Sequence, residues 1–390
     1  MKRLFLLSAL VTLACSGEAA VSNADPQDPE VEGPASPDAP EPSDPAADPR
    51  SAVGDDVEEG GSVFDGSHEP AYVEQTALYT GRGDGDHWLV AAGENLLFAD
   101  TTGDQLLQIS VSSGKLSVVA SEQPGVAWLS TDAGVGYWAT ETDAGATLQF
   151  KDLRSGRAGS LAEGIEVPEG AVVGDGAVVW YDWASHGIVG VAMDEPGRVV
   201  TLVADASAHA PAIADGFVYY ASELDHGSIR RVALDADFKT QDSELVLGQL
   251  GQQISKFGNH TTRDLQVVDG EIWFTSGVEG GSVWHIADEG TLENVGGENL
   301  QARGLTVTDD QVFWVTYSGS SEQRDGTLWA APLRGASDEV GKAQSAQPRV
   351  VAEHVGWVEH LAVAQGALFF TTSRTQGLFS VERLGAPKSN

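Results

Sequence analysis

The chain has 390 residues, with 58 acidic and 22 basic side chains and a formal net charge of -36. This acidic balance repels phosphate backbones, which argues against nucleic acid as a partner, and it keeps a protein soluble. Cys15 is the single cysteine of the chain, which excludes an internal disulfide and a metal cage built from thiolates.

The first residues have the pattern of an export signal. Two basic residues follow Met1, and residues 4–13 form an apolar run that is too short for a permanent membrane span. The next segment, Ala14-Cys15-Ser16-Gly17, resembles the lipobox of bacterial lipoproteins, where cleavage precedes a cysteine that is then acylated. The resemblance predicts a lipoprotein signal peptide over residues 1–14 and lipidation of Cys15. The alternative is an ordinary secretory signal.

Residues 15–70 read as a linker. Nine of the sixteen prolines lie between Pro26 and Pro70, and residues 16–75 hold 16 acidic side chains and one basic side chain. Such a stretch buries too little apolar surface to offset the entropy of ordering, and proline and like charges extend it. The composition predicts a disordered acidic, Pro-rich tether that holds the following domain away from a membrane.

From residue 71 to residue 386 a strand-type phrase recurs seven times. Its last aromatic residues are 40, 42, 40, 54, 40 and 56 positions apart, and they are Phe98, Trp138, Trp180, Tyr220, Phe274, Trp314 and Phe370. A period near 40 residues with strand content is typical of propeller blades. We therefore predict an all-β fold, a seven-bladed β-propeller over residues 71–386, in which the aromatic side chains fill the space between blades.

Each repeat divides into four strands. A turn such as Asp175-Gly176 or Asp215-Gly216 separates the first two strands, because these residue pairs accept positive φ. A glycine such as Gly187 opens the third strand. The seventh repeat lacks a fourth strand, whereas residues 72–79 precede the first repeat where a fourth strand belongs. Pairing of these two ends is expected to close the ring.

The aromatic phrases carry a family resemblance. Tyr137-Trp138-Ala139-Thr140, Trp273-Phe274-Thr275-Ser276 and Phe369-Phe370-Thr371-Thr372 are similar to the Tyr-Trp-Thr-Asp repeats of β-propellers, and relatives of this kind occur in bacterial surface lipoproteins. The resemblance covers about residues 72–385 and implies fold rather than function. That family has six blades as a rule. The alternatives to seven blades are six or eight.

In a propeller, the loops from the fourth strand to the next blade share one face with the loops between strands two and three. Two long loops fall on this face, 248–264 and 317–325, and long loops on a rigid scaffold are favoured binding places. The residues just before each first strand should ring the channel on the same face. The candidate binding residues are His87, Trp88, His209, Lys256, His260, Arg263, Arg303, Tyr317, Glu359 and His360.

No cofactor motif is present in the sequence, and the alternative is a divalent metal held by His87, His209 and His360. Two guanidinium groups in one funnel, Arg263 and Arg303, would suit an anionic group.

These residues support two functional hypotheses. The first is a monomeric, non-enzymatic binding or scaffold propeller, lipid-anchored in the bacterial cell envelope at the outer membrane, on its periplasmic or its surface face. Its partner would be an envelope protein or a small anionic or carbohydrate ligand. The second is a propeller lyase or hydrolase that uses the His, Arg and Glu side chains of the channel mouth.

Overall fold

The computed structural model describes residues 75–82, 87–205, 207–235, 238–252, 254, 262–276, 282–286, 290–296, 301–308, 310–318, 325–333, 348–374 and 378–384. The predicted signal peptide, Cys15 and the predicted linker lie outside the described residues. Among the residues described, no helix has the length and apolar character to cross a membrane.

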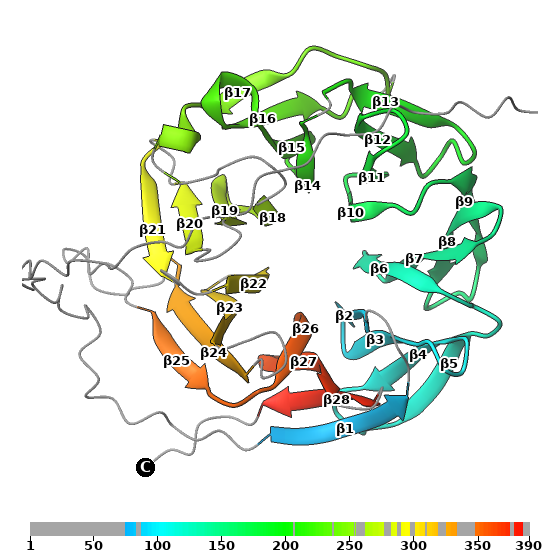
Figure 1. Ribbon diagram of the computed structural model, residues 1–390. Coiled ribbons are helices and arrows are strands. Elements are labelled where there is room, and N and C mark those ends of the chain that lie inside the picture. Colours follow the sequence, from blue (N-terminus) through cyan, green and yellow to red (C-terminus); the bar gives the residue numbers. More distant parts are fainter. Residues whose placement is uncertain are drawn as a thin grey trace, which may run out of the picture. The chain divides into compact units, whose positions relative to one another are not determined.

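The described residues form seven antiparallel sheets of four strands each, arranged in a ring (Figure 1). This confirms the prediction of a seven-bladed β-propeller over the six- and eight-bladed alternatives. Blades one to six follow chain order, β2–β5, β6–β9, β10–β13, β14–β17, β18–β21 and β22–β25, and blade seven is β26–β28 with β1. The first strand of each blade lies nearest the centre of the ring (Figure 1).

The strands have the following bounds: β1 (Gln75–Arg82), β2 (Leu89–Ala92), β3 (Asn95–Asp100), β4 (Gln105–Ser110), β5 (Leu116–Ala120), β6 (Val126–Asp132), β7 (Val135–Thr142), β8 (Gly145–Asp152), β9 (Ala158–Ile165), β10 (Glu169–Gly174), β11 (Ala177–Asp182), β12 (Gly187–Ala192), β13 (Val199–Val203), β14 (His209–Ala214), β15 (Phe217–Ser222), β16 (Ser228–Ala233), β17 (Glu244–Leu247), β18 (Thr262–Val268), β19 (Glu271–Ser276), β20 (Ser282–Ile286), β21 (Leu292–Gly296), β22 (Gln301–Val307), β23 (Gln311–Ser318), β24 (Asp325–Pro332), β25 (Arg349–Ala352), β26 (Trp357–Ala364), β27 (Ala367–Arg374) and β28 (Leu378–Leu384). Two single 3₁₀ turns, η1 (Leu224–His226) and η2 (Leu250–Gln252), complete the described elements.

The turns between first and second strands have the conformation that their sequences predict. Asp175 and Gly176 have φ of 47° and 77°, and Asp215 and Gly216 have φ of 52° and 75°. Two successive residues with positive φ match the twist of antiparallel strands in a two-residue hairpin. The amide of Gly216 also donates to Asp175 Oδ2 at 2.8 Å, so this turn of blade three is bonded to that of blade four.

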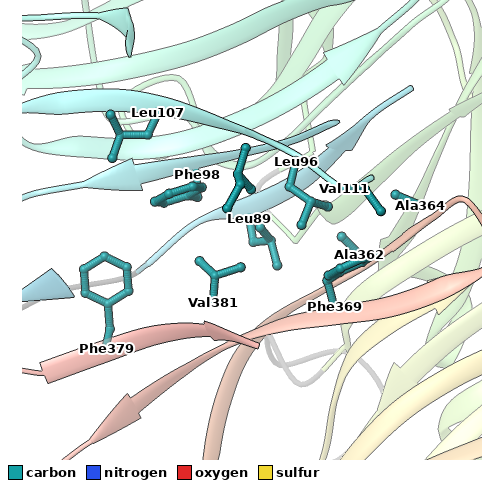
Figure 2. Packing of buried hydrophobic residues seen from close by; sticks show 11 residues of the cluster. Leu89, Leu96, Phe98, Leu107, Val111, Ala362, Ala364, Phe369, Phe379 and Val381 are labelled. Atoms are coloured by element: carbon teal, nitrogen blue, oxygen red, sulfur yellow. The ribbon is translucent and has the colours of Figure 1, made fainter. Parts of the chain in front are cut away.

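The second strand of each blade supplies the core between blades. Because side chains alternate across a strand, Leu96 and Phe98 of β3 pack toward blade seven, whereas Leu97 and Ala99 pack toward blade two. The seven aromatic residues of the repeat are all buried, as predicted. Figure 2 shows the seam between blades one and seven, where Phe98 of β3 and Leu107 of β4 lie opposite Phe379 and Val381 of β28.

The ring is closed by the N-terminal strand. β1 pairs with β28 in antiparallel register from Gln75 opposite Leu384 to Arg82 opposite Leu378, which confirms the predicted closure. The described strand begins three residues after the predicted start and ends three residues after the predicted end. At Gly81 an added Cβ would lie 2.4 Å from Cε1 of Phe379, so glycine lets that ring pack closely against the strand.

Candidate functional site

The channel-facing strands share an irregularity at the point where each begins. Among the described residues, β6, β10, β14, β18, β22 and β26 each carry a register shift within their first few residues, whereas β2 has none. In β10, β14 and β22 the shift coincides with a residue of positive φ, namely Gly170, Ala210 and Gly304. A β-bulge redirects the side chains beside it and is common near binding sites.

The bulges place a ring of side chains at one end of the channel. These line a cavity of about 640 Å³, which we call the mouth cavity, and they come from blades one and three to seven. Five predicted candidates are brought together in its lining: Trp88, His209, Arg303, Glu359 and His360. The volume lies within the range of about 300–1,000 Å³ that is usual for small-molecule sites.

Other candidates are placed elsewhere. The ring of His87 is buried and stacks on Phe379 with 3.9 Å between ring centroids, and His87 does not line the mouth cavity. Tyr317 is buried and does not line the mouth cavity. Lys256 and His260, and the side chain of Arg263, lie outside the described residues.

A stack of side chains supports Arg303. Its guanidinium carbon lies 5.2 Å from the ring centroid of Trp357, and that ring lies 4.5 Å from the ring of Tyr317. The Tyr317 hydroxyl donates to the carbonyl of Val358, which fixes the bottom of the stack. Tyr317 therefore acts as a support for the arginine rather than as part of the cavity lining.

The opposite side of the mouth joins blades one and seven. Oε2 of Glu359 accepts the backbone amide of His87 at 2.7 Å, and the rings of Trp88 and His360 stack with 4.2 Å between centroids. The Thr371 hydroxyl donates to the carbonyl of His87 at 2.7 Å. The backbone of His87 is thus bonded to Glu359 and Thr371 of blade seven, although the ring of His87 does not face the cavity. These bonds hold the neighbouring Trp88 against His360 at the mouth.

Two carboxylates and one guanidinium group give the mouth cavity a mixed charge. Asp264 and Glu359 are carboxylates, and Arg303 is a guanidinium. Oδ2 of Asp264 accepts the Thr275 hydroxyl at 3.1 Å, which fixes that carboxylate on β18. His209, 6% exposed, has its Nδ1 2.8 Å from the carbonyl of Ser207.

The imidazole of His360 titrates well below its ordinary range. Atoms of the surrounding inner strands desolvate the ring and lower its pKa from 6.5 to about 4, and nearby His87 acts in the same direction. His360 is therefore neutral at pH 7. The side chain keeps part of its surface open to the cavity.

This shift predicts a pH dependence of stability. Between pH 6.5 and 4 the unfolded chain binds a proton at His360 that the folded chain does not, so the free energy of unfolding falls as the pH falls through this window. The depressed pKa of His360 lowers the free energy of unfolding by at most about 3 kcal/mol over this pH window. Replacing His360 by Gln should flatten the slope of unfolding free energy against pH between 6.5 and 4, measured by urea unfolding. The exposed His186→Asn serves as the control, and equal slopes for wild type and His360→Gln would contradict the prediction.

Sequence analysis missed two aromatic residues of the mouth. Tyr181 ends strand β11 and Trp183 follows it, and their rings meet edge to face at 4.8 Å. Both line the mouth cavity, and Trp183 is 44% exposed. The available signal was a third aromatic after Trp180-Tyr181, at a place where the chain leaves its buried strand.

The other end of the channel has a different lining. A cavity of about 800 Å³ there shares Gln266, Thr306 and Leu361 with the mouth cavity. Its described lining carries no arginine or histidine side chain. Throughout the described residues, no group of three His, Cys, Asp or Glu side chains is placed to hold a metal ion.

The fold and the mouth cavity define a seven-bladed β-propeller with a ligand-sized cavity at one end of its channel. No family model matches the sequence, and no curated protein matches it. Solved structures do match. A streptogramin B lyase is similar with a TM-score of 0.55 and 12% identity, over 80% of this chain and 98% of that one.

Two further structures are similar to the same extent. Virginiamycin B lyase from Staphylococcus aureus has a TM-score of 0.53 and 11% identity, over 80% of this chain and 100% of that one. The β-propeller domain of the trilobed protease from Pyrococcus furiosus has a TM-score of 0.53 and 8% identity, over 80% of this chain and 96% of that one. At these identities the similarity establishes the propeller fold alone.

Proposed function

We propose that this chain is a lipid-anchored binding protein of a bacterial envelope, held at the outer membrane, and that its ligand site is the mouth cavity. One observation carries the proposal. A cavity of about 640 Å³ gathers aromatic, cationic and anionic side chains from six blades, on elements that the interblade core holds rigid. Concave sites with a few convergent polar groups are the usual places for small ligands.

The charges of the cavity favour a neutral, hydroxyl-rich ligand. Arg303 offers donors, whereas Asp264 and Glu359 offer acceptors, so an anion would gain one favourable charge and meet two unfavourable ones. Trp88 and the exposed ring of Trp183 add flat apolar surface. A carbohydrate presents hydroxyl groups and apolar C–H faces together, and of the two small ligand classes that the sequence suggests, it fits this lining better than an anion does.

The low pKa of His360 argues against this residue as the general base of an enzyme that works at neutral pH. A general base works best when its pKa lies near the operating pH, and burial holds the pKa of His360 at about 4. A propeller lyase or hydrolase is the alternative. It would need a different proton-transfer group at the mouth.

The binding proposal is tested with Arg303→Ala. Full-length protein in detergent is titrated calorimetrically with neutral mono- and disaccharides, and the variant should bind at least about tenfold more weakly because a charged hydrogen-bond donor to the ligand is lost. Arg349→Ala is the matched control, since Arg349 is exposed on strand β25. Equal affinities for the wild type and Arg303→Ala, or no binding by either, would overturn the proposal.

The anchoring is tested separately. Replacing Cys15 by Ala should release the protein from the membrane fraction or leave its signal unprocessed, because the acyl chains would have no attachment site. The measurements are the mature mass and the distribution between membrane and soluble fractions. Unchanged mass and unchanged membrane association would show that Cys15 is not lipidated.

A further inference from the structure

The mouth cavity continues into a second hollow on the same face. This hollow, the blade-two crevice, has a volume of about 1190 Å³ and runs over the loop ends of blades one to three. Trp88, Gly170 and Trp183 line both hollows. The crevice alone exceeds the volume of about 1,000 Å³ at the upper end of single small-molecule sites, so the two together suit an elongated ligand.

Trp183 stands at the junction and is held in place. The amide of Ala184, its neighbour, donates to Oε2 of Glu166 at 3.0 Å, and the amide of Ser185 donates to Oδ2 of Asp182 at 2.8 Å. These bonds fix the loop around Trp183, whose side chain is 44% exposed. A rigid aromatic surface loses little conformational entropy when a ligand covers it.

The crevice carries acceptors but no described cation. Its charged side chains are Glu141, at the end of β7, and Glu166, in the loop after β9. Glycines line its floor, and a Cβ added at Gly164 would meet no atom within 4 Å, so the space stays open. Carboxylates accept hydrogen bonds from hydroxyl groups but repel anions, which disfavours acidic glycans.

The crevice is built from strand ends and loops. Its lining residues lie at the ends of β6 to β10, in the connections between them, and just before β2, just after β3 and just after β11, so it does not present a strand edge along its length. Binding of an extended peptide by strand addition needs such an edge. A chain of pyranose rings needs only flat apolar surfaces and hydrogen-bonding groups at intervals.

We infer that the mouth cavity and the blade-two crevice form one extended site for a neutral oligosaccharide, with one end at Arg303 and Glu359 and the other at Glu141. Trp183 is the stacking surface between them. This inference rests on the proposed function and deepens it from a small carbohydrate to a glycan of several residues.

The test uses length series of neutral glycans. Cello-, malto- and chito-oligosaccharides of two to six units are titrated into the full-length protein. For the series that binds, the hexasaccharide should bind at least about tenfold more tightly than the disaccharide, because it reaches the crevice. In Trp183→Ala, and in Glu141→Ala, the ratio of disaccharide to hexasaccharide Kd should fall to about one. Leu116→Ala is the control, since Leu116 is 43% exposed on the outer strand β5.

The outcomes separate the two proposals. If disaccharide and hexasaccharide bind equally and Arg303→Ala weakens both, the mouth cavity binds sugar and the extended site is wrong. If none of the series binds at all, both proposals fail. If basic peptides bind in a manner that depends on Glu141 while the glycans do not, the crevice is a protein-binding surface and the inference is overturned.

Discussion

Removal of residues 1–82 should lower the melting temperature by more than about 10 °C relative to removal of residues 1–74 alone. The difference between the two truncations is strand β1, which pairs with β28 along its length. Tyr79 on this strand packs on Phe98 with 4.8 Å between centroids, and its hydroxyl donates to Oδ2 of Asp100 at 2.7 Å. Truncation of a fully buried aromatic residue costs about 3–5 kcal/mol, and the half-buried Tyr79 contributes less than that, but here the strand pairing is lost with it.

The truncation also exposes the edge of β28. An unpaired edge strand is a template for pairing between chains, so the shorter protein should aggregate on warming, which light scattering would detect. Tyr79→Ala in the longer truncate should give an intermediate melting temperature. Equal melting temperatures for the two truncates would mean that β1 does not carry the closure.

The second large effect on stability is expected at the start of β12, the third strand of blade three. Gly187→Val should lower the free energy of unfolding by about 3 kcal/mol, at the upper end of the range of about 1–3 kcal/mol that overpacking typically costs. A Cβ at Gly187 would lie 2.2 Å from the carbonyl oxygen of Val203, which is backbone and cannot move aside without shifting β13. The measurement is urea unfolding at constant pH.

The control is a glycine with room for a side chain. At Gly248 the nearest atoms to an added Cβ lie 3.6 Å away, so Gly248→Ala should be almost neutral. The same close approach recurs at Gly145 and Gly326, where an added Cβ would lie 2.9 and 2.6 Å from a backbone oxygen. A small effect at Gly187 would show that strands three and four separate easily at this end of the blade.

This recurrence explains a pattern that the sequence shows without a reason. Glycine opens the third strand in several repeats, and the sequence alone gives no physical reason for it. The structure gives the cause at Gly187, where the third strand meets the end of the fourth at a register shift between Ile188 and Val189. Contact with a backbone oxygen 16 residues later in the chain, at Val203, cannot be read from the local pattern.

For the candidate site, too, one part was predictable from the sequence and another part was not. Position in the repeat was enough to place Trp88, His209, Arg303, Glu359 and His360 around one mouth, because equivalent residues of a propeller fall at equivalent places. The direction in which each side chain points was not predictable from the sequence. His87 and Trp88 are adjacent, yet the ring of His87 packs on Phe379 and the ring of Trp88 stacks on His360.

The sequence by itself determined the architecture: repeat period, buried aromatic residues, turn residues with positive φ and the displaced closing strand. Each of these depends on local propensity or on a periodicity that the chain carries along its length. Only the tertiary structure decided which side chains face the channel, that Trp183 joins two hollows, and that desolvation keeps His360 neutral. These properties depend on bulges and on neighbours from other blades, and such contacts between residues as far apart as Trp88 and His360 arise only when the ring closes.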